Sequence, residues 1–240
     1  MYIVILVFSA AIVYFLTTYL LTITKVINQG NFRINDFVIT SKVDVSEVEN
    51  VDIYGENDDK KAEIENELEN SKDFVLNVSQ RNKFSILIPQ RDDVKIDRVY
   101  LSNVKITGEN KTIYLKTSDN EEILNGEKEE YNLKLEEEEN QYLIEFNLVN
   151  KNILENVKVP DEVKVVVYDG TILNTLGFDL YNLKYHFNAT LNVLDSSGKT
   201  SYCNISVDMP REGLGENGIV IERENLEEYT LKLKQKYLNF

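Results

Sequence analysis

The chain contains one cysteine, Cys203, and one histidine, His186, so only these two residues offer a thiol or an imidazole for catalysis. A nucleophilic cysteine needs a base within reach of its sulfur. Cys203 falls on the apolar face of a predicted strand, and His186 falls on the polar face of the preceding one, so a sheet separates the two side chains. A single cysteine also excludes an internal disulfide, and the pair is too small for a Cys/His zinc site.

His186 would also have to be the base of any Ser-His-Asp triad. It lies in the middle of a strand pattern, without the Gly-x-Ser-x-Gly elbow that presents a catalytic serine in many hydrolases. We therefore interpret His186 as a solvated strand histidine. The sequence predicts no catalytic residue and no cofactor, and we expect that the protein is not an enzyme.

Carboxylates are abundant, with 41 Asp and Glu residues. Two carboxylates at a fixed separation are enough for glycoside hydrolysis, so a hydrolase that uses such a pair is an alternative hypothesis. Most of the acidic residues, however, occur in runs that are typical of solvated faces and loops. These runs are Glu121–Glu122, Glu129–Glu130 and Glu136–Glu139.

Three short acidic segments could supply oxygen ligands to calcium: Asn57–Asp59, Asp92–Asp93 and Asp119–Glu121. None has the spacing of an EF-hand loop, and ordinary acidic turns are the simpler interpretation of all three. Whether the protein binds a metal is left open by the sequence.

The overall charge indicates which partners the protein can have. Its 240 residues carry 26 Lys and Arg against 41 Asp and Glu, a formal net charge of −15. A nucleic acid is therefore not an expected partner, because binding to phosphates needs a basic surface. With 42% hydrophobic residues, the chain has enough apolar side chains to build a folded core.

The first 24 residues predict a membrane anchor. No charged residue precedes Lys25, and about 20 apolar residues are enough for a helix to cross a bilayer. Because no basic residue precedes the apolar run and no small-residue cleavage site follows it, we expect the segment to stay attached.

The side of the membrane on which the rest of the chain lies is less clear. The positive-inside rule, applied to Lys25, Arg33 and Lys42, places the C-terminal domain in the cytoplasm. Many single-helix anchors instead hold a β-rich domain outside the cytoplasm, and we expect this second arrangement.

The rest of the chain alternates between apolar and polar residues, which is typical of strands. The pattern is clearest on both sides of the turn Asp195–Gly198, where Leu191, Cys203 and Ile205 are predicted to face a core. On the opposite face, Asn192 and Asn204 are predicted to be solvated. Only residues 58–71 and 224–240 compete as helices outside the predicted anchor, and the second segment also fits a strand.

We therefore predict an all-β fold, in which an N-terminal transmembrane helix is followed by an antiparallel β-sandwich. A weak repeat, in which Glu130–Leu135 resembles Glu228–Leu233, suggests two tandem Ig-like sandwiches. The expected domains are then an anchor at 1–24, a linker at 25–34, and sandwiches at 35–138 and 139–240. The alternative is one large sandwich over 35–240.

Taken together, these features favour a single-pass, membrane-anchored protein of the cell envelope. Its acidic sandwich would act as a binding or scaffolding module in a surface assembly, with a protein or an envelope polymer as partner. The alternatives are the membrane-tethered hydrolase with two carboxylates and a cytoplasm-facing accessory subunit of a membrane complex.

Overall fold

The computed structural model describes residues 31–47, 75–108, 113–117, 122–124, 128–159, 171–179 and 184–234, together with residues 13, 14 and 17. The first strands are β1 (Asp36–Glu47), β2 (Val75–Pro89), β3 (Ile96–Gly108), β4 (Ile113–Thr117), β5 (Glu122–Leu124) and β6 (Glu130–Leu133). They are followed by β7 (Leu135–Glu138), β8 (Gln141–Lys158), the short helix α3 (Ile172–Thr175), β9 (Tyr185–Asp195) and β10 (Thr200–Met209). The last elements are the short helix α4 (Leu214–Asn217), β11 (Ile219–Arg223) and β12 (Lys232–Leu233).

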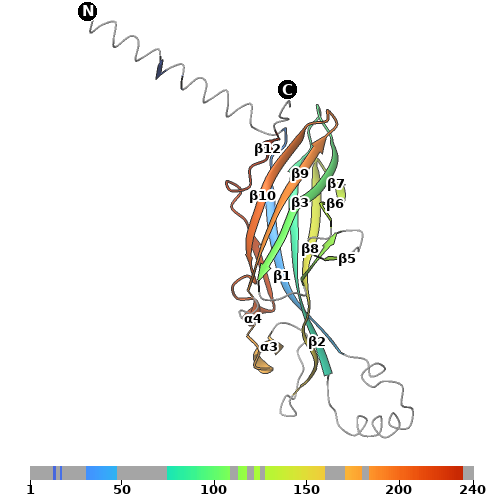
Figure 1. Ribbon diagram of the computed structural model, residues 1–240, viewed down its shortest axis with the longest axis vertical. Coiled ribbons are helices and arrows are strands. Elements are labelled where there is room, and N and C mark those ends of the chain that lie inside the picture. Colours follow the sequence, from blue (N-terminus) through green and yellow to red (C-terminus); the bar gives the residue numbers. More distant parts are fainter. Residues whose placement is uncertain are drawn as a thin grey trace, which may run out of the picture.

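The strands form two antiparallel sheets whose long strands follow the long axis of the molecule (Figure 1). One sheet has the order β11-β1-β2-β8-β4-β5, with β7 also paired to β8. The other has the order β12-β10-β9-β3-β6. The protein is therefore mostly β, as the alternation predicts, and the two sheets are consistent with a β-sandwich.

Both sheets combine strands from the two halves of the chain. In the first sheet, β2 pairs with β8 from Val75 to Pro89, and β1 pairs with β11. In the second sheet, β3 pairs with β9. The strands of 35–138 and of 139–240 thus hydrogen-bond to each other on both sides of a common core.

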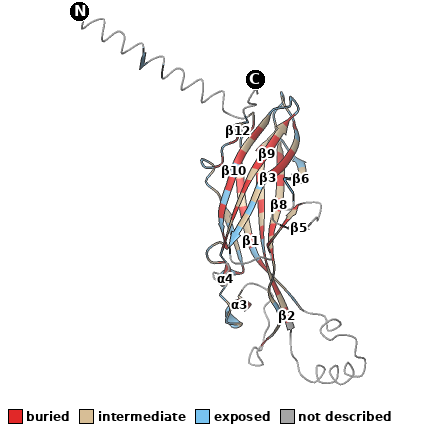
Figure 2. Cartoon of the chain, viewed as in Figure 1, coloured by how far each residue is buried: buried red, intermediate tan, exposed pale blue. Residues whose placement is uncertain are grey.

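The core lies between the sheets and is built from the inward positions of the long strands (Figure 2). Phe84 on β2 and Phe146 on β8 stack with their ring centroids 4.5 Å apart. Phe187, from the opposite sheet, approaches Phe84 to 5.5 Å between centroids. Because every second residue of a strand points to the same face, the alternating apolar residues of β2, β8 and β9 all reach this core.

The hairpin predicted around Asp195–Gly198 is confirmed. β9 and β10 pair from Tyr185 with Met209 to Leu194 with Thr200. Leu191, Cys203 and Ile205 are buried, and Asn204 is exposed, as predicted.

The prediction for Asn192 is wrong, because this residue is fully buried. It stands on the outer face of β9, between Tyr100 of β3 and Tyr202 of β10 in the pairing register. Its Nδ2 donates to the Ser102 Oγ and to the Thr190 carbonyl oxygen, at 2.9 Å each. Asn192 is thus buried although it is on the outer face, where large side chains stand beside it on both neighbouring strands.

Several predicted features fall outside the described residues. The anchor at 1–24 does so except at residues 13, 14 and 17, and so does the candidate helix at 58–71. Within the described part of the chain, no helix has the length and apolar character needed to cross a membrane. Residues 224–234, which fitted either a helix or a strand, contain the short strand β12 beside β10.

Candidate functional site

Cys203 and His186 lie on opposite faces of the β9–β10 hairpin, as the alternation predicts. Cys203 points into the core and is 3% exposed, and burial raises the pKa of its thiol to about 11. The thiol is therefore protonated near neutral pH and cannot serve as a thiolate nucleophile. The two residues do not form a catalytic pair.

His186 instead joins a chain of hydrogen bonds across β9 and β10. Its Nδ1 lies 2.6 Å from Asp208 Oδ1, and its Nε2 lies 3.1 Å from Ser206 Oγ. The sequence motifs did not predict this Ser-His-Asp order, although the hairpin register pairs His186 with Asp208 directly. Counting residues along both strands outward from the turn Asp195–Gly198 places His186 opposite Asp208, so the sequence contains a signal for this contact.

The chemistry of this Ser206–His186–Asp208 cluster differs from that of a hydrolase triad. In a catalytic triad the aspartate is buried, so that it orients and stabilises the imidazolium. The Asp208 side chain is 89% exposed, and the cluster lies on the outer face of the sheet. The hydrogen bonds therefore act as cross-strand contacts that help to hold β9 against β10.

A hollow of about 650 Å³ adjoins the cluster, and we call it the side hollow. His186 and Asp208 line it, whereas Ser206 does not. Arg211, at its rim, forms ion pairs with Glu222, at 3.0 Å, and with Glu224. Arg211 thus has carboxylate partners of its own, and the Ser206 hydroxyl contacts the imidazole of His186 rather than lining the hollow. The remaining lining residues are Thr107, Lys184, Tyr185, Met209, Pro210 and Glu212.

The carboxylates with shifted pKa values do not have the character of a general acid, which needs a raised pKa. A hydrogen bond from Arg91 lowers the pKa of Asp93, and one from Lys134 lowers that of Glu136. Burial raises the pKa of Asp195, but hydrogen bonds from Ser197, Lys199 and Asn31 outweigh it and lower the pKa.

The calcium candidates are only partly covered by the structure. Residues 57–59 and 119–121 lie outside the described residues. In Asp92–Asp93, the carboxylate of Asp93 is bound by the guanidinium of Arg91, at 2.8 and 2.7 Å. In the described ranges, no three His, Cys, Asp or Glu side chains gather as a metal site would require.

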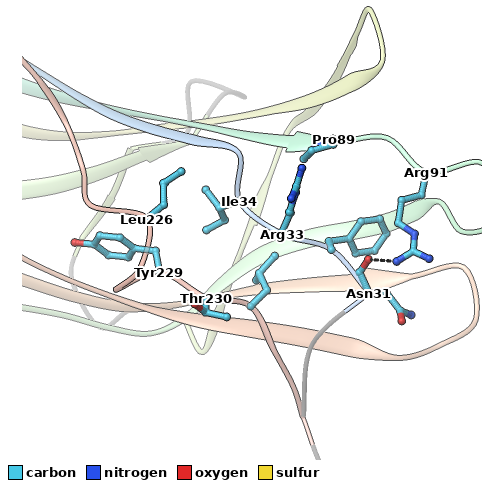
Figure 3. Close-up of a pocket in the computed structure, with 10 residues that line it drawn as sticks. Asn31, Arg33, Ile34, Pro89, Arg91, Leu226, Tyr229 and Thr230 are labelled. Carbon is cyan, nitrogen blue, oxygen red and sulfur yellow. Dashed lines mark hydrogen bonds between the residues drawn. The ribbon is translucent and has the colours of Figure 1, made fainter. Parts of the chain in front are cut away.

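A second hollow, of about 500 Å³, lies at one end of the sandwich, and we call it the end hollow (Figure 3). Its wall joins three separated segments: residues 31–34 before β1, the end of β2, and residues 226–231 before β12. The lining residues are Asn31, Phe32, Arg33, Ile34, Pro89, Arg91, Leu226, Tyr229, Thr230 and Leu231.

The lining of the end hollow combines apolar and cationic groups. Ile34, Leu226 and Tyr229 lie together on one side in Figure 3, and Arg91 lies with Asn31 on the other. Arg33 is exposed. Among the described residues, no carboxylate lines this hollow, although acidic residues outnumber basic ones by 41 to 26 in the chain. No sequence pattern indicates this site, because its three segments are far apart along the chain.

Residues 31–34 are attached to the sandwich rather than extended away from it. Phe32 and Ile34 are buried in the main core. Asn31 Nδ2 donates to Asp195 Oδ2 at 2.5 Å, and Arg91 donates to the Asn31 carbonyl oxygen at 2.6 Å. The last residues of the predicted linker therefore hold a defined position at the end of the sandwich.

Comparisons with protein-family models, with curated proteins and with solved structures found no match for this chain.

Proposed function

We propose that the chain is a single-pass membrane-anchored protein of the cell envelope, and that its acidic sandwich is a binding or scaffolding module outside the cytoplasm. The uncharged segment at 1–24 is the basis for the anchor. In this proposal the protein holds a protein or an envelope polymer near the membrane and catalyses no reaction.

The observation that carries the proposal is the attachment of residues 31–34 to the end of the sandwich. A chain that leaves an anchor at residue 24 has only residues 25–30 before the contacts of Asn31 begin. Phe32 and Ile34 then enter the core, so a partner bound to the sandwich would be kept at a limited distance from the anchor. Such an arrangement suits a module that positions something at a membrane surface.

The end hollow supports a binding role, because it lies beside these same residues. Its apolar wall and the exposed guanidinium group of Arg33 suit a partner group that is partly apolar and anionic, whereas Arg91 is already bound to Asp93 and to the Asn31 carbonyl. The net charge of the whole chain, −15, would by contrast attract basic partners to the rest of its surface.

Protease treatment of intact cells, compared with permeabilised cells, tests the location of the sandwich. We expect cleavage of the sandwich in intact cells. Protection until the membrane is opened would contradict the proposal and favour the cytoplasm-facing accessory subunit.

A photo-crosslinking amino acid at Thr230, in the wall of the end hollow, tests the binding role. The matched control carries the same group at Lys116, which is on β4. We expect a crosslinked product in membranes from Thr230 but not from Lys116. Equal products from the two positions, or none from either, would contradict binding at the end hollow.

A further inference from the structure

Charged residues are unevenly distributed along the chain. Three segments contain basic residues and neither Asp nor Glu: residues 25–35, 196–207 and 229–240. Their basic residues are Lys25, Arg33, Lys199, Lys232, Lys234 and Lys236. In a chain whose net charge is −15, these segments are locally positive, and the tertiary structure determines whether they form one surface.

The fold brings the described parts of these three segments to one end of the sandwich. Asn31 Nδ2 donates to Oδ2 of Asp195, the last residue of β9, at 2.5 Å. Lys234 N–H donates to the carbonyl oxygen of Thr200, the first residue of β10, at 2.8 Å. The end hollow also joins the first segment to the third, because residues of both line its wall.

The cations of these segments are exposed, and we call this surface the basic end. Its exposed cations are Arg33, Lys199, Lys232 and Lys234. Asp195, beside them, is buried and accepts hydrogen bonds from donors of the same end, and Asp93 is bound by Arg91. The exposed carboxylates that adjoin the basic end along the chain are Asp92, Asp97, Glu227 and Glu228. The positive charge is therefore concentrated on Arg33, the β9–β10 turn and β12.

We propose that the basic end binds anionic phospholipid headgroups of the membrane that holds the anchor. The proposal names the partner of the end hollow and rests on the anchor of the proposed function, on whichever side of the membrane the sandwich lies. An anionic phospholipid is both partly apolar and anionic. Arg33 faces its phosphate, and the apolar wall with Leu226 and Tyr229 faces the glycerol and the nearest methylene groups. Lys199, Lys232 and Lys234 face the neighbouring headgroups.

The length of chain before the sandwich favours this partner over a soluble one. Residues 25–30 join the predicted anchor to Asn31, and fully extended they span at most about 20 Å. The end hollow is therefore held near the headgroups whatever the conformation of this segment. Because salt screens charges over about 8 Å, the basic end is the part of the sandwich that an anionic membrane surface attracts.

The binding has a consequence for the orientation of the sandwich. The long strands follow the long axis of the molecule, and the basic end lies at one end of that axis (Figure 1). With this end on the headgroups, the axis points away from the bilayer. The same anionic surface repels the more acidic remainder of the chain, so both interactions favour this orientation.

Photo-crosslinking of the full-length chain in vesicles tests the proposal. A photo-reactive amino acid replaces Thr230, which is exposed and lines the end hollow. The chain is reconstituted into vesicles of phosphatidylcholine alone or of phosphatidylcholine mixed with phosphatidylglycerol, and mass spectrometry measures the lipid adduct. One variant combines Arg33→Gln, Lys232→Gln and Lys234→Gln. The matched control combines Lys42→Gln, Lys105→Gln and Lys184→Gln, which removes the same charge from exposed positions outside the basic end.

We expect about ten times more adduct in the vesicles that contain phosphatidylglycerol, since each basic residue near an anionic surface strengthens binding about fivefold. The Arg33, Lys232 and Lys234 variant should lose this excess, whereas the control variant should keep it. The excess should also disappear at about 1 M salt, where the screening length falls to about 3 Å.

Two results would overturn the proposal. One is an equal adduct yield in the two kinds of vesicle. The other is loss of the adduct to soluble polyphosphate at constant ionic strength, which would assign the basic end to a soluble anionic polymer. Flotation of the same samples tests the anchor separately. A chain that floats with both kinds of vesicle but shows no excess adduct contradicts lipid binding alone, and one that floats only with phosphatidylglycerol contradicts the anchor alone.

Discussion

Asn82 on β2 donates a hydrogen bond from Nδ2 to the hydroxyl oxygen of Tyr185 on β9, at 2.5 Å, and so connects the two sheets through the core. Both residues are buried, and Gln80 Nε2 in turn donates to Asn82 Oδ1 at 3.2 Å. These polar groups separate the large aromatic core from a smaller apolar cluster that includes Val43 and Val78. A buried polar contact of this kind is costly to break, because water cannot replace the lost partner.

The Tyr185→Phe substitution should therefore lower the free energy of unfolding by about 1–3 kcal/mol, since it leaves Asn82 Nδ2 without its acceptor. Urea denaturation of the two proteins measures this difference. Tyr202→Phe, on the outer face of β10, is the matched control and should change stability by less than about 0.5 kcal/mol. Equal effects of the two substitutions would show that the Asn82–Tyr185 contact contributes nothing.

The stability of the protein should fall at alkaline pH, in part because of Cys203. Burial raises the pKa of this thiol from 9.0 to about 11, so the folded chain keeps a proton that the unfolded chain releases. The contribution of Cys203 is complete below pH 9 and is lost as the pH rises from there to 11. Cys203→Ala should reduce the slope of stability against pH in this window, as measured by denaturation at each pH.

The same burial predicts how Cys203 reacts. A thiol reagent at pH 8 should label the native chain at least a hundred times more slowly than the urea-unfolded chain, because the sulfur is both covered and protonated. Rapid labelling of the native protein would contradict its position in the core.

The two asparagines of the hairpin should respond differently to replacement. Asn192→Ala removes the hydrogen bonds to Ser102 and to the Thr190 carbonyl at a fully buried position, so it should cost about 1–3 kcal/mol of stability. Asn204→Ala, at an exposed position, should cost less than about 0.5 kcal/mol. Thermal or urea denaturation of both variants checks the difference, and equal costs would contradict the burial of Asn192.

Asp195 should control the attachment of residues 31–34. Its carboxylate accepts hydrogen bonds from the Ser197 and Lys199 N–H groups and from Asn31 Nδ2. Asp195→Ala should speed amide hydrogen exchange in residues 31–34, whereas Asp97→Ala, near the start of β3, should not. Because the pKa of Asp195 is lowered, the same attachment should also weaken as the pH falls below about 4.

The local pattern of the sequence was enough to predict the strands and most of their faces. Apolar residues at every second position place Phe84, Phe146 and Phe187 inward, since a strand has no other way to present them on one side. The turn Asp195–Gly198 determined the register of β9 and β10, because a short turn leaves the two strands only one way to pair. Cys203 could therefore be placed in the core before its contacts were known.

Pairing between distant strands was decided only by the tertiary structure. Alternation gives the face of a residue but not its neighbours, so the sequence did not reveal that Asn192 lies between Tyr100 and Tyr202. For the same reason the end hollow, built from Arg33, Arg91 and Tyr229, could not be found in the linear order. Which strand lies at the edge of a sheet, as β11 does among the described strands, likewise depends on how all the strands of that sheet are arranged.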